Sequence, residues 1–201
     1  MANFKRPLPH QHDYDVEKYK HVYIPLQQQG WYAIANASDQ ADIAVEDAVA
    51  SAGSGNPSFG EISTFGFTGL HIDAAGDDIS LLWPVPFDCD VKSAIDFRVW
   101  WSSGSSTTTD TFTWKILYGE FTADGEVLAA PATALSTAIA ADTLVGANYI
   151  QATAWGTLNG GTLTNGNMIG LTVELDAADA TLGSEATYGY ILEIRYIRRA
   201  L

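Results

Sequence analysis

The sequence is poor in sulfur, with a single cysteine, Cys89, among 201 residues. An intramolecular disulfide is therefore excluded, and the neighbouring residues offer no thiol or imidazole partner for zinc. A chain of this length can bury roughly 70% of the surface that its unfolded state exposes, so neither a disulfide nor a metal is needed to hold it together. We interpret Cys89 as a structural thiol.

Long apolar segments are also missing. No stretch reaches the about 20 consecutive apolar residues that a membrane-spanning helix needs. The opening residues, MANFKRPLPHQHDYDV, have no apolar segment of the kind found in signal peptides. We therefore expect the chain to fold in a reducing cytoplasm.

Basic residues are scarce in the middle of the chain. The formal net charge is −14, and residues 21–194 hold 21 acidic side chains against three basic ones, Lys92, Arg98 and Lys115, which makes this region −18. Such a body repels DNA and RNA phosphates, so we expect no nucleic-acid partner. The acidity also helps to keep a β-rich protein soluble. The other basic residues lie in the first twenty and last seven residues, and this asymmetry predicts an arm that docks on an acidic partner.

Signatures of catalysis and of metal binding are absent or incomplete. There is no GxSxG, P-loop or HExxH motif, and the glycine-rich run at 53–60 has no lysine for phosphate binding. His10 and His12 could face one metal from an extended segment, but they have no further close ligand. The acidic turn at 73–78 lacks the ligand spacing of an EF-hand, and nothing selects a carboxylate pair for glycoside hydrolysis. We therefore predict no enzymatic activity, no cofactor and no metal site.

The apolar residues follow the period of β-strands. Residues 1–20 contain Pro7 and Pro9, have no such period and are expected to form an extended N-terminal arm. Residues 21–201 are predicted to form an all-β antiparallel β-sandwich or jelly roll, because about eight strand-like runs are separated by glycine-rich turns. The runs lie at 22–26, 31–35, 63–72, 78–86, 95–101, 111–118, 167–177 and from Tyr188 onward, while 38–52 alone has helical composition.

The stretch RVWWSSGSSTTTDTFTWKILY (98–118) places three tryptophans around a loop of serine, threonine and glycine. Strict alternation predicts an antiparallel pair of strands joined by a flexible loop, with Trp101 and Trp114 facing the core. Trp100 lies on the opposite face. It could stack on a sugar, as could Trp31 or Trp155, but a subunit interface is favoured because aromatic residues are enriched there.

The last strand is apolar on both sides. Tyr188, Tyr190, Leu192, Ile194 and Tyr196 share the core face, whereas Ile191 and Ile197 lie on the other face near Arg195. A strand that is apolar on both faces is usually buried on both. We therefore predict that this face packs against neighbouring copies, with Trp100, Ile191, Arg195 and Ile197 at the subunit interface.

Several segments in a fixed order resemble the jelly-roll domains of virion proteins of tailed bacteriophages. They are LLWPVPFDCDVKSAIDFRVWW, TFTWKILYGEF, NYIQATAW, NGNMIGLTVELDA and YGYILEIRYIRR, and together they cover roughly residues 80–201. The resemblance implies a homotrimer without catalytic residues that serves as a capsid decoration (cement) protein or in a head or tail fibre. The chain has no repeats and no coiled-coil shaft, which favours the decoration protein.

The resemblance also implies a way of acting. The arm would dock on the major capsid protein, with Arg195, Arg198 and Arg199 assisting, and many bound copies would stabilise the head. The protein would be made in the host cytoplasm and located on the capsid surface of the virion. The alternative is a receptor- or glycan-binding tip of a phage head or tail fibre, and a glycan-active enzyme is a third hypothesis. The residues predicted to form the docking arm are Phe4, Lys5, Arg6, Pro7, Tyr14, Lys18 and Lys20.

Overall fold

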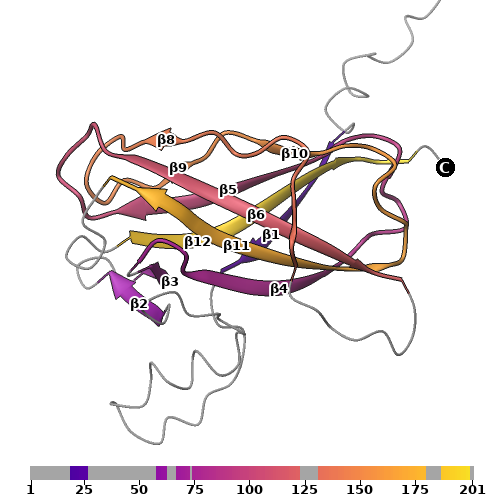
Figure 1. The fold of residues 1–201 in the computed structure, drawn as a ribbon, viewed down its shortest axis with the longest axis horizontal. Helices are drawn as coiled ribbons and strands as arrows, with labels where there is room; N and C mark the ends of the chain where they lie inside the picture. Colours follow the sequence, from indigo (N-terminus) through magenta and orange to yellow (C-terminus); the bar gives the residue numbers. More distant parts are fainter. Residues whose placement is uncertain are drawn as a thin grey trace, which may run out of the picture.

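The computed structural model describes residues 19–26, 58–62, 67–72, 74–122, 131–179 and 187–199. These residues form two antiparallel sheets (Figure 1). The strands are β1 (Tyr19–Pro25), β2 (Ser58–Ile62), β3 (Phe67–Ile72), β4 (Asp78–Pro84), β5 (Ile95–Ser103), β6 (Thr111–Phe121), β7 (Thr133–Ala134), β8 (Asp142–Thr143), β9 (Gln151–Ala152), β10 (Gly156–Leu158), β11 (Met168–Ala178) and β12 (Thr187–Ile197).

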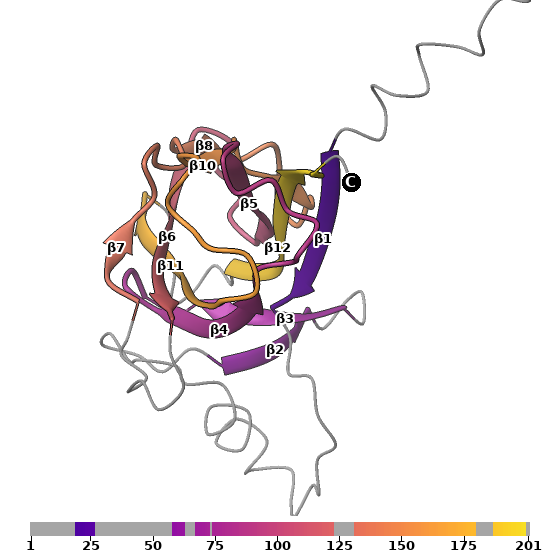
Figure 2. The same ribbon diagram turned by 90° about the vertical axis from the view of Figure 1, so that its right-hand side faces the viewer.

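The order of the strands is that of a jelly roll. Sheet A runs β10-β5-β12-β3-β2, with β1 also paired to β12 and β9 to β5, and sheet B runs β4-β11-β6-β7, with β8 also paired to β6. The chain changes sheet between β3 and β4, β4 and β5, β5 and β6, β8 and β9, β10 and β11, and β11 and β12. The two late strands β11 and β12 each lie between two earlier ones, as the double Greek key of a jelly roll requires. The all-β sandwich expected from the sequence is thus confirmed, and Figure 2 shows the two sheets facing each other.

The core lies between the sheets and is rich in aromatic side chains. Trp101 and Trp114 are 0% and 1% exposed, and their ring centroids lie 6.3 Å apart. Phe112 lies 4.5 Å from Trp101 by the same measure. The predicted inward faces of β5 and β6 are confirmed, as are Leu192, Ile194 and Tyr196 on β12. The prediction that Tyr188 and Tyr190 share this core face is wrong, because a bulge between Gly189 and Ile191 shifts the alternation. Gly189 faces Trp114 in the core, and Tyr190 packs over Gly69 on the other face.

The predicted pairing of the two strands in the 98–118 stretch is wrong. β5 pairs with β12, β10 and β9 in sheet A, whereas β6 pairs with β11, β7 and β8 in sheet B. The connecting loop crosses from one sheet to the other. Alternation identifies the buried face of a strand but carries no information about its hydrogen-bonded neighbour, so the pairing could not be read from it.

The connecting loop is also ordered instead of flexible. The Ser105 side chain is fully buried, and its hydroxyl donates to Asp110 at 2.7 Å. The Ser105 amide donates to the Ser103 hydroxyl, and the Thr107 amide donates to the Ser105 hydroxyl. The serine and threonine side chains therefore replace the backbone hydrogen bonds that a strand would make.

The other expectations concern the region after β6, the segments at 31–35 and 38–52, and the end of the arm. The region after Pro131 forms the short strands β7 to β10. The strand expected at 31–35 and the helical segment at 38–52 lie outside the described residues. Tyr19 and Lys20, which we assigned to the arm, belong to β1 and pair with Ile197 and Tyr196. No helix in the part of the chain that the structure describes has the length and apolar character needed to span a lipid bilayer.

Cys89 has the surroundings of a structural thiol. Its side chain is 0% exposed. Burial raises the pKa of the Cys89 thiol to about 11, and the nearby carboxylates of Asp88 and Asp90 act in the same direction. The thiol is therefore protonated at neutral pH and shielded from reagents, which makes it a poor nucleophile.

Candidate functional site

The outer surface of sheet A carries large aromatic and charged side chains over β1, β5 and β12. These side chains point away from the core, and we call them the aromatic–arginine face. The face comprises Tyr19, His21 and Tyr23 from β1, Asp96, Arg98 and Trp100 from β5, Glu193 and Arg195 from β12, and Trp155 from the segment before β10.

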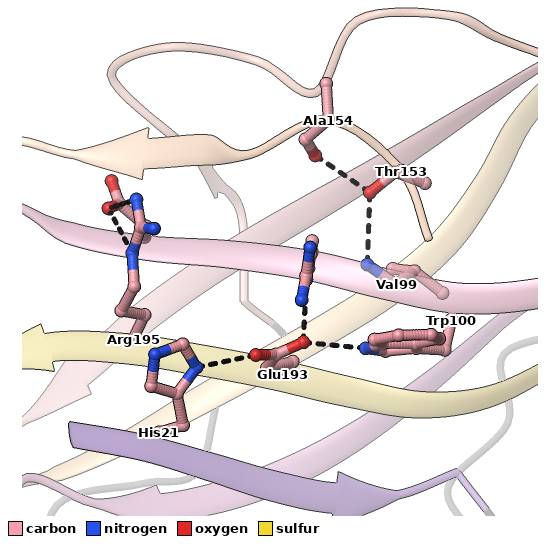
Figure 3. A network of polar contacts seen from close by, with 9 residues as sticks. His21, Val99, Trp100, Thr153, Ala154, Glu193 and Arg195 are labelled. Atoms are coloured by element: carbon pink, nitrogen blue, oxygen red, sulfur yellow. Dashed lines mark hydrogen bonds and ion pairs between the residues drawn. The ribbon is translucent and has the colours of Figure 1, made fainter. Parts of the chain in front are cut away.

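Glu193 lies at the centre of the face and is completely buried, although its strand turns it away from the core. Its carboxylate accepts hydrogen bonds from His21 Nδ1 at 2.6 Å, Arg98 Nε at 2.6 Å and Trp100 Nε1 at 2.7 Å (Figure 3). Burial alone would raise the pKa of Glu193, but hydrogen bonds from Arg98, Trp100 and His21 outweigh it and hold the pKa below the ordinary glutamate value. Glu193 is therefore ionised at neutral pH.

Two arginines and three aromatic rings form a continuous stacked series across the face. The Arg98 guanidinium lies 5.0 Å from the ring centroid of Trp100 and 4.3 Å from that of Trp155. The Arg195 guanidinium lies 4.2 Å from the ring centroid of Trp155 and 4.9 Å from that of Tyr19. Planar guanidinium groups stack well on aromatic rings, and such contacts hold both partners in place.

Each arginine of this series is also paired with a carboxylate. Arg195 donates to one oxygen of Asp96 through Nε at 3.1 Å and Nη2 at 2.6 Å. Arg98 is paired with Glu193. The two positive charges are therefore balanced within the face, which leaves a rigid aromatic surface and no free cationic site.

Trp155 is held over the face by the strand beside it. Thr153, two residues earlier, donates its amide to the Val99 carbonyl at 3.0 Å, and its hydroxyl accepts from the Val99 amide at 3.1 Å (Figure 3). From this anchor Trp155 reaches Arg98, Arg195 and the edge of His21, at 6.3 Å between ring centroids. Trp155 thereby stacks on the Arg98 guanidinium, which pairs with Glu193.

The residues predicted for the subunit interface lie together on this outer face. Ile191 is opposite Trp100 and Arg195 is opposite Asp96 in the β5–β12 register, while Ile197 is opposite Tyr19 on β1. All four predicted residues are half-buried. Their contact with another copy stays a prediction.

The other predicted site residues are spread more widely. Lys20 lies in β1, with Nζ 3.3 Å from Asp88. The remaining arm residues, the candidate ligands His10 and His12, and Trp31 lie outside the described residues; these arm residues are Phe4, Lys5, Arg6, Pro7, Tyr14 and Lys18. Among the described residues, no group of three His, Cys, Asp or Glu side chains is close enough to hold a metal ion.

Sequence reasoning missed the central network of Glu193, Arg98 and His21. A signal for it existed, because Glu193 lies in a strand that is apolar on both faces, and a buried carboxylate needs a partner. Only three basic residues lie in the body before Arg195, and Arg98 is one of them. Sequence alternation could not have supplied His21, which reaches Glu193 only through the tertiary fold. The same holds for Trp155, which stacks on Arg98.

The face is suited to binding and not to proton transfer. The Glu193 carboxylate accepts hydrogen bonds from His21, Arg98 and Trp100 and is 0% exposed, so a substrate cannot reach it. The stacked rings and paired charges of the face present a preorganised surface. Preorganisation lowers the entropic cost of ordering side chains when the face contacts another surface.

Comparisons with known proteins find no close relative. No family model matches the chain, and no curated protein matches it. Solved structures that are similar include the CBM36-1 domain of a multidomain xylanase from the hindgut metagenome of Trinervitermes trinervoides, with 13% identity, a TM-score of 0.41, and coverage of 87% of this chain and 96% of that one. Another is the insecticidal delta-endotoxin Cry8Ea1 from Bacillus thuringiensis, with 11% identity, a TM-score of 0.45, and coverage of 90% of this chain and 24% of the toxin. Neither is a virion protein, and neither function is carried over to this chain.

Proposed function

We propose that this chain is a non-enzymatic structural protein that acts by association, and that its aromatic–arginine face packs against neighbouring copies in a homotrimer. The observation that carries the proposal is the composition of the face. Tryptophan, tyrosine and arginine are the residues most enriched among interface hot spots, and here they form one stacked series flanked by the half-buried Ile191 and Ile197.

The setting that we propose is the surface of a phage capsid. The jelly-roll topology and the resemblance of residues 80–201 to virion proteins of tailed phages support this setting. In it, the protein decorates the head, the arm docks on the major capsid protein, and the trimer links adjacent capsomers. Copies that bind only the assembled shell stabilise it by mass action.

Sedimentation of the purified protein tests the proposed interface. We expect the wild type to have three times the 21.6 kDa mass of the chain at micromolar concentration. The Ile197→Glu variant should be a monomer, because it places an unpaired charge in the interface. The matched control is Leu82→Glu, which changes a 52% exposed residue of β4 in sheet B and should leave the mass unchanged. A monomeric wild type would overturn the proposal.

A truncation tests the role of the arm. Residues 1–18 should be removed, because Tyr19 and Lys20 belong to β1 and their loss would shorten the sheet. We expect the truncated protein to keep its thermal unfolding midpoint and its oligomeric mass but to lose binding to undecorated capsids, measured as copies per particle. Full occupancy of capsids by the truncated protein would refute docking through the arm.

A further inference from the structure

The two basic ends of the chain meet at one end of the sandwich. β1 begins where β12 ends, with Tyr19 opposite Ile197. The residues that follow β12 contact the 86–93 turn, since Arg198 forms a β-bridge with Cys89 and the Arg199 amide donates to the Asp88 carbonyl at 2.7 Å. We call this region the basic end. In Figure 1 the start of β1 and the end of β12 lie near each other on the right.

The charge of the basic end is opposite to that of the chain as a whole. Four basic side chains, Lys20, Lys92, Arg198 and Arg199, gather around two acidic ones, Asp88 and Asp90, for a local balance of +2 on a chain of −14. The side chains of Lys20 and Arg198 are 46% and 52% exposed.

The other three described basic side chains are neutralised elsewhere. Arg98 pairs with Glu193, Arg195 with Asp96, and Lys115 with Glu174 and Asp176. Among the residues that the structure describes, the basic end is therefore where positive charge remains in excess.

An exposed phenylalanine, Phe87, lies within the basic end. Phe87 is 82% exposed, although the turn that carries it is firmly held. The Cys89 amide donates to the Pro86 carbonyl at 3.0 Å. The Asn165 side chain donates to the carbonyls of both Pro86 and Cys89, at 2.9 and 2.7 Å. Two carbonyls that flank Phe87 are thus tied to one amide, while the Cys89 side chain anchors the turn in the core.

The ring of Phe87 also packs against Gly166. A Cβ atom on Gly166 would lie 2.8 Å from the ring, so this glycine leaves the space in which the ring lies. Gly166 has φ of +83°, a conformation that glycine adopts without strain. A large apolar side chain held in a fixed position at the surface is suited to a preorganised contact, because little side-chain freedom is lost when a partner binds it.

We propose that the basic end is a docking surface for an acidic protein surface, with Phe87 entering an apolar pocket and the surrounding lysines and arginines facing carboxylates. This inference deepens the proposed function and rests on it in one respect, since it names the end of the jelly roll that meets the partner. Charge complementarity specifies the partner. A nucleic acid or an anionic membrane would be repelled by the acidic body, whereas a local cluster of carboxylates on a protein meets only the basic end.

Site-specific photocrosslinking tests the docking surface. Benzoylphenylalanine is placed at position 87 of the full-length chain in the cells that naturally make the protein, and the crosslinked peptides are identified by mass spectrometry. The control position is Tyr149, which is 63% exposed. It follows Asn148, whose amide donates to the carbonyl of Ser103 at the far end of β5. We expect position 87 to crosslink to one peptide of another protein, rich in Asp and Glu, and position 149 to give no such product.

A charge-reversed protein completes the test. Lys92→Glu with Arg199→Glu changes exposed side chains and leaves the Lys20 and Arg198 pairs with Asp88 intact. We expect the crosslink yield at position 87 to fall at least about tenfold, because like charges then face each other across the interface. A yield that does not change overturns the proposal. So does a crosslink to a second copy of this chain, to nucleic acid or to lipid, or the lack of any crosslink.

The outcome of the crosslinking can be told apart from the outcomes for the trimer and for the capsid setting. A crosslink at position 87 with a monomeric sedimentation mass would leave the docking surface standing and overturn the proposed subunit interface. An acidic partner other than a shell protein would support the docking surface and overturn the capsid setting.

Discussion

Replacing Glu193 by glutamine should lower the free energy of unfolding by about 3–5 kcal/mol, the cost of breaking a buried ion pair by removing one partner. The carboxylate is 0% exposed and accepts from Arg98, Trp100 and His21. A neutral amide leaves the Arg98 charge uncompensated beneath the tryptophans and turns an NH2 group toward donors. Urea unfolding followed by circular dichroism measures the loss.

A second glutamate provides a matched control. Glu174 pairs with Lys115 at 3.2 Å, but the side chains are 15% and 38% exposed. Because water screens such a pair, Glu174→Gln should cost only about 0–1 kcal/mol. Equal losses in the two variants would mean that the Glu193 network does not stabilise the face in the way its geometry indicates.

The Glu193 variant should also change the pH dependence of stability. The pKa of Glu193 in the folded protein lies below its ordinary value, so its contribution is complete above the ordinary glutamate pKa of about 4.3 and is lost as the pH falls from there through the lower folded pKa. The wild type should therefore lose stability more steeply with acidification than Glu193→Gln. Asp88 also has a lowered pKa, but it is present in both proteins, so the difference between the two curves isolates Glu193. Parallel curves would contradict the assignment.

Replacing Trp101 by alanine should cost about 3–5 kcal/mol, the range for deleting a large aromatic side chain from a core. Trp101 is fully buried against Phe112 and Trp114, and its indole nitrogen donates to Asp142 at 3.2 Å. The variant loses the packing of the ring and leaves Asp142 without this donor. The midpoint of urea unfolding, compared at equal slope, measures the loss.

Phe87→Ala is the control for Trp101→Ala. Phe87 is 82% exposed, so its removal should change the free energy of unfolding by no more than about 0.5 kcal/mol. A loss at Phe87 as large as that at Trp101 would show that the ring supports the fold, and it would remove the reason for considering Phe87 a docking residue.

The alternation of residues was sufficient to predict the inward faces of β5 and β6, but it failed for Tyr188 and Tyr190, which precede Ile191 at the bulge in β12. Phe97, Val99 and Trp101 on β5 and Phe112, Trp114 and Ile116 on β6 are all buried as expected. Alternation also placed Trp100, Ile191, Arg195 and Ile197 outside the core, where the structure has them. Such predictions succeed because the direction of a side chain along a strand depends on residues that are adjacent in the sequence.

The sequence by itself therefore determined the class of the fold, the side chains that fill the core and the sign of the charge on the body. Only the tertiary structure decided that β5 pairs with β12 instead of β6, that His21 and Arg98 converge on Glu193, and that the start of β1 and the end of β12 meet the turn that carries Phe87. The physical reason is the same in each case. Strand pairing is set by hydrogen bonds and packing between segments that are far apart in the chain. A local period of two in the sequence does not specify which of these segments pair.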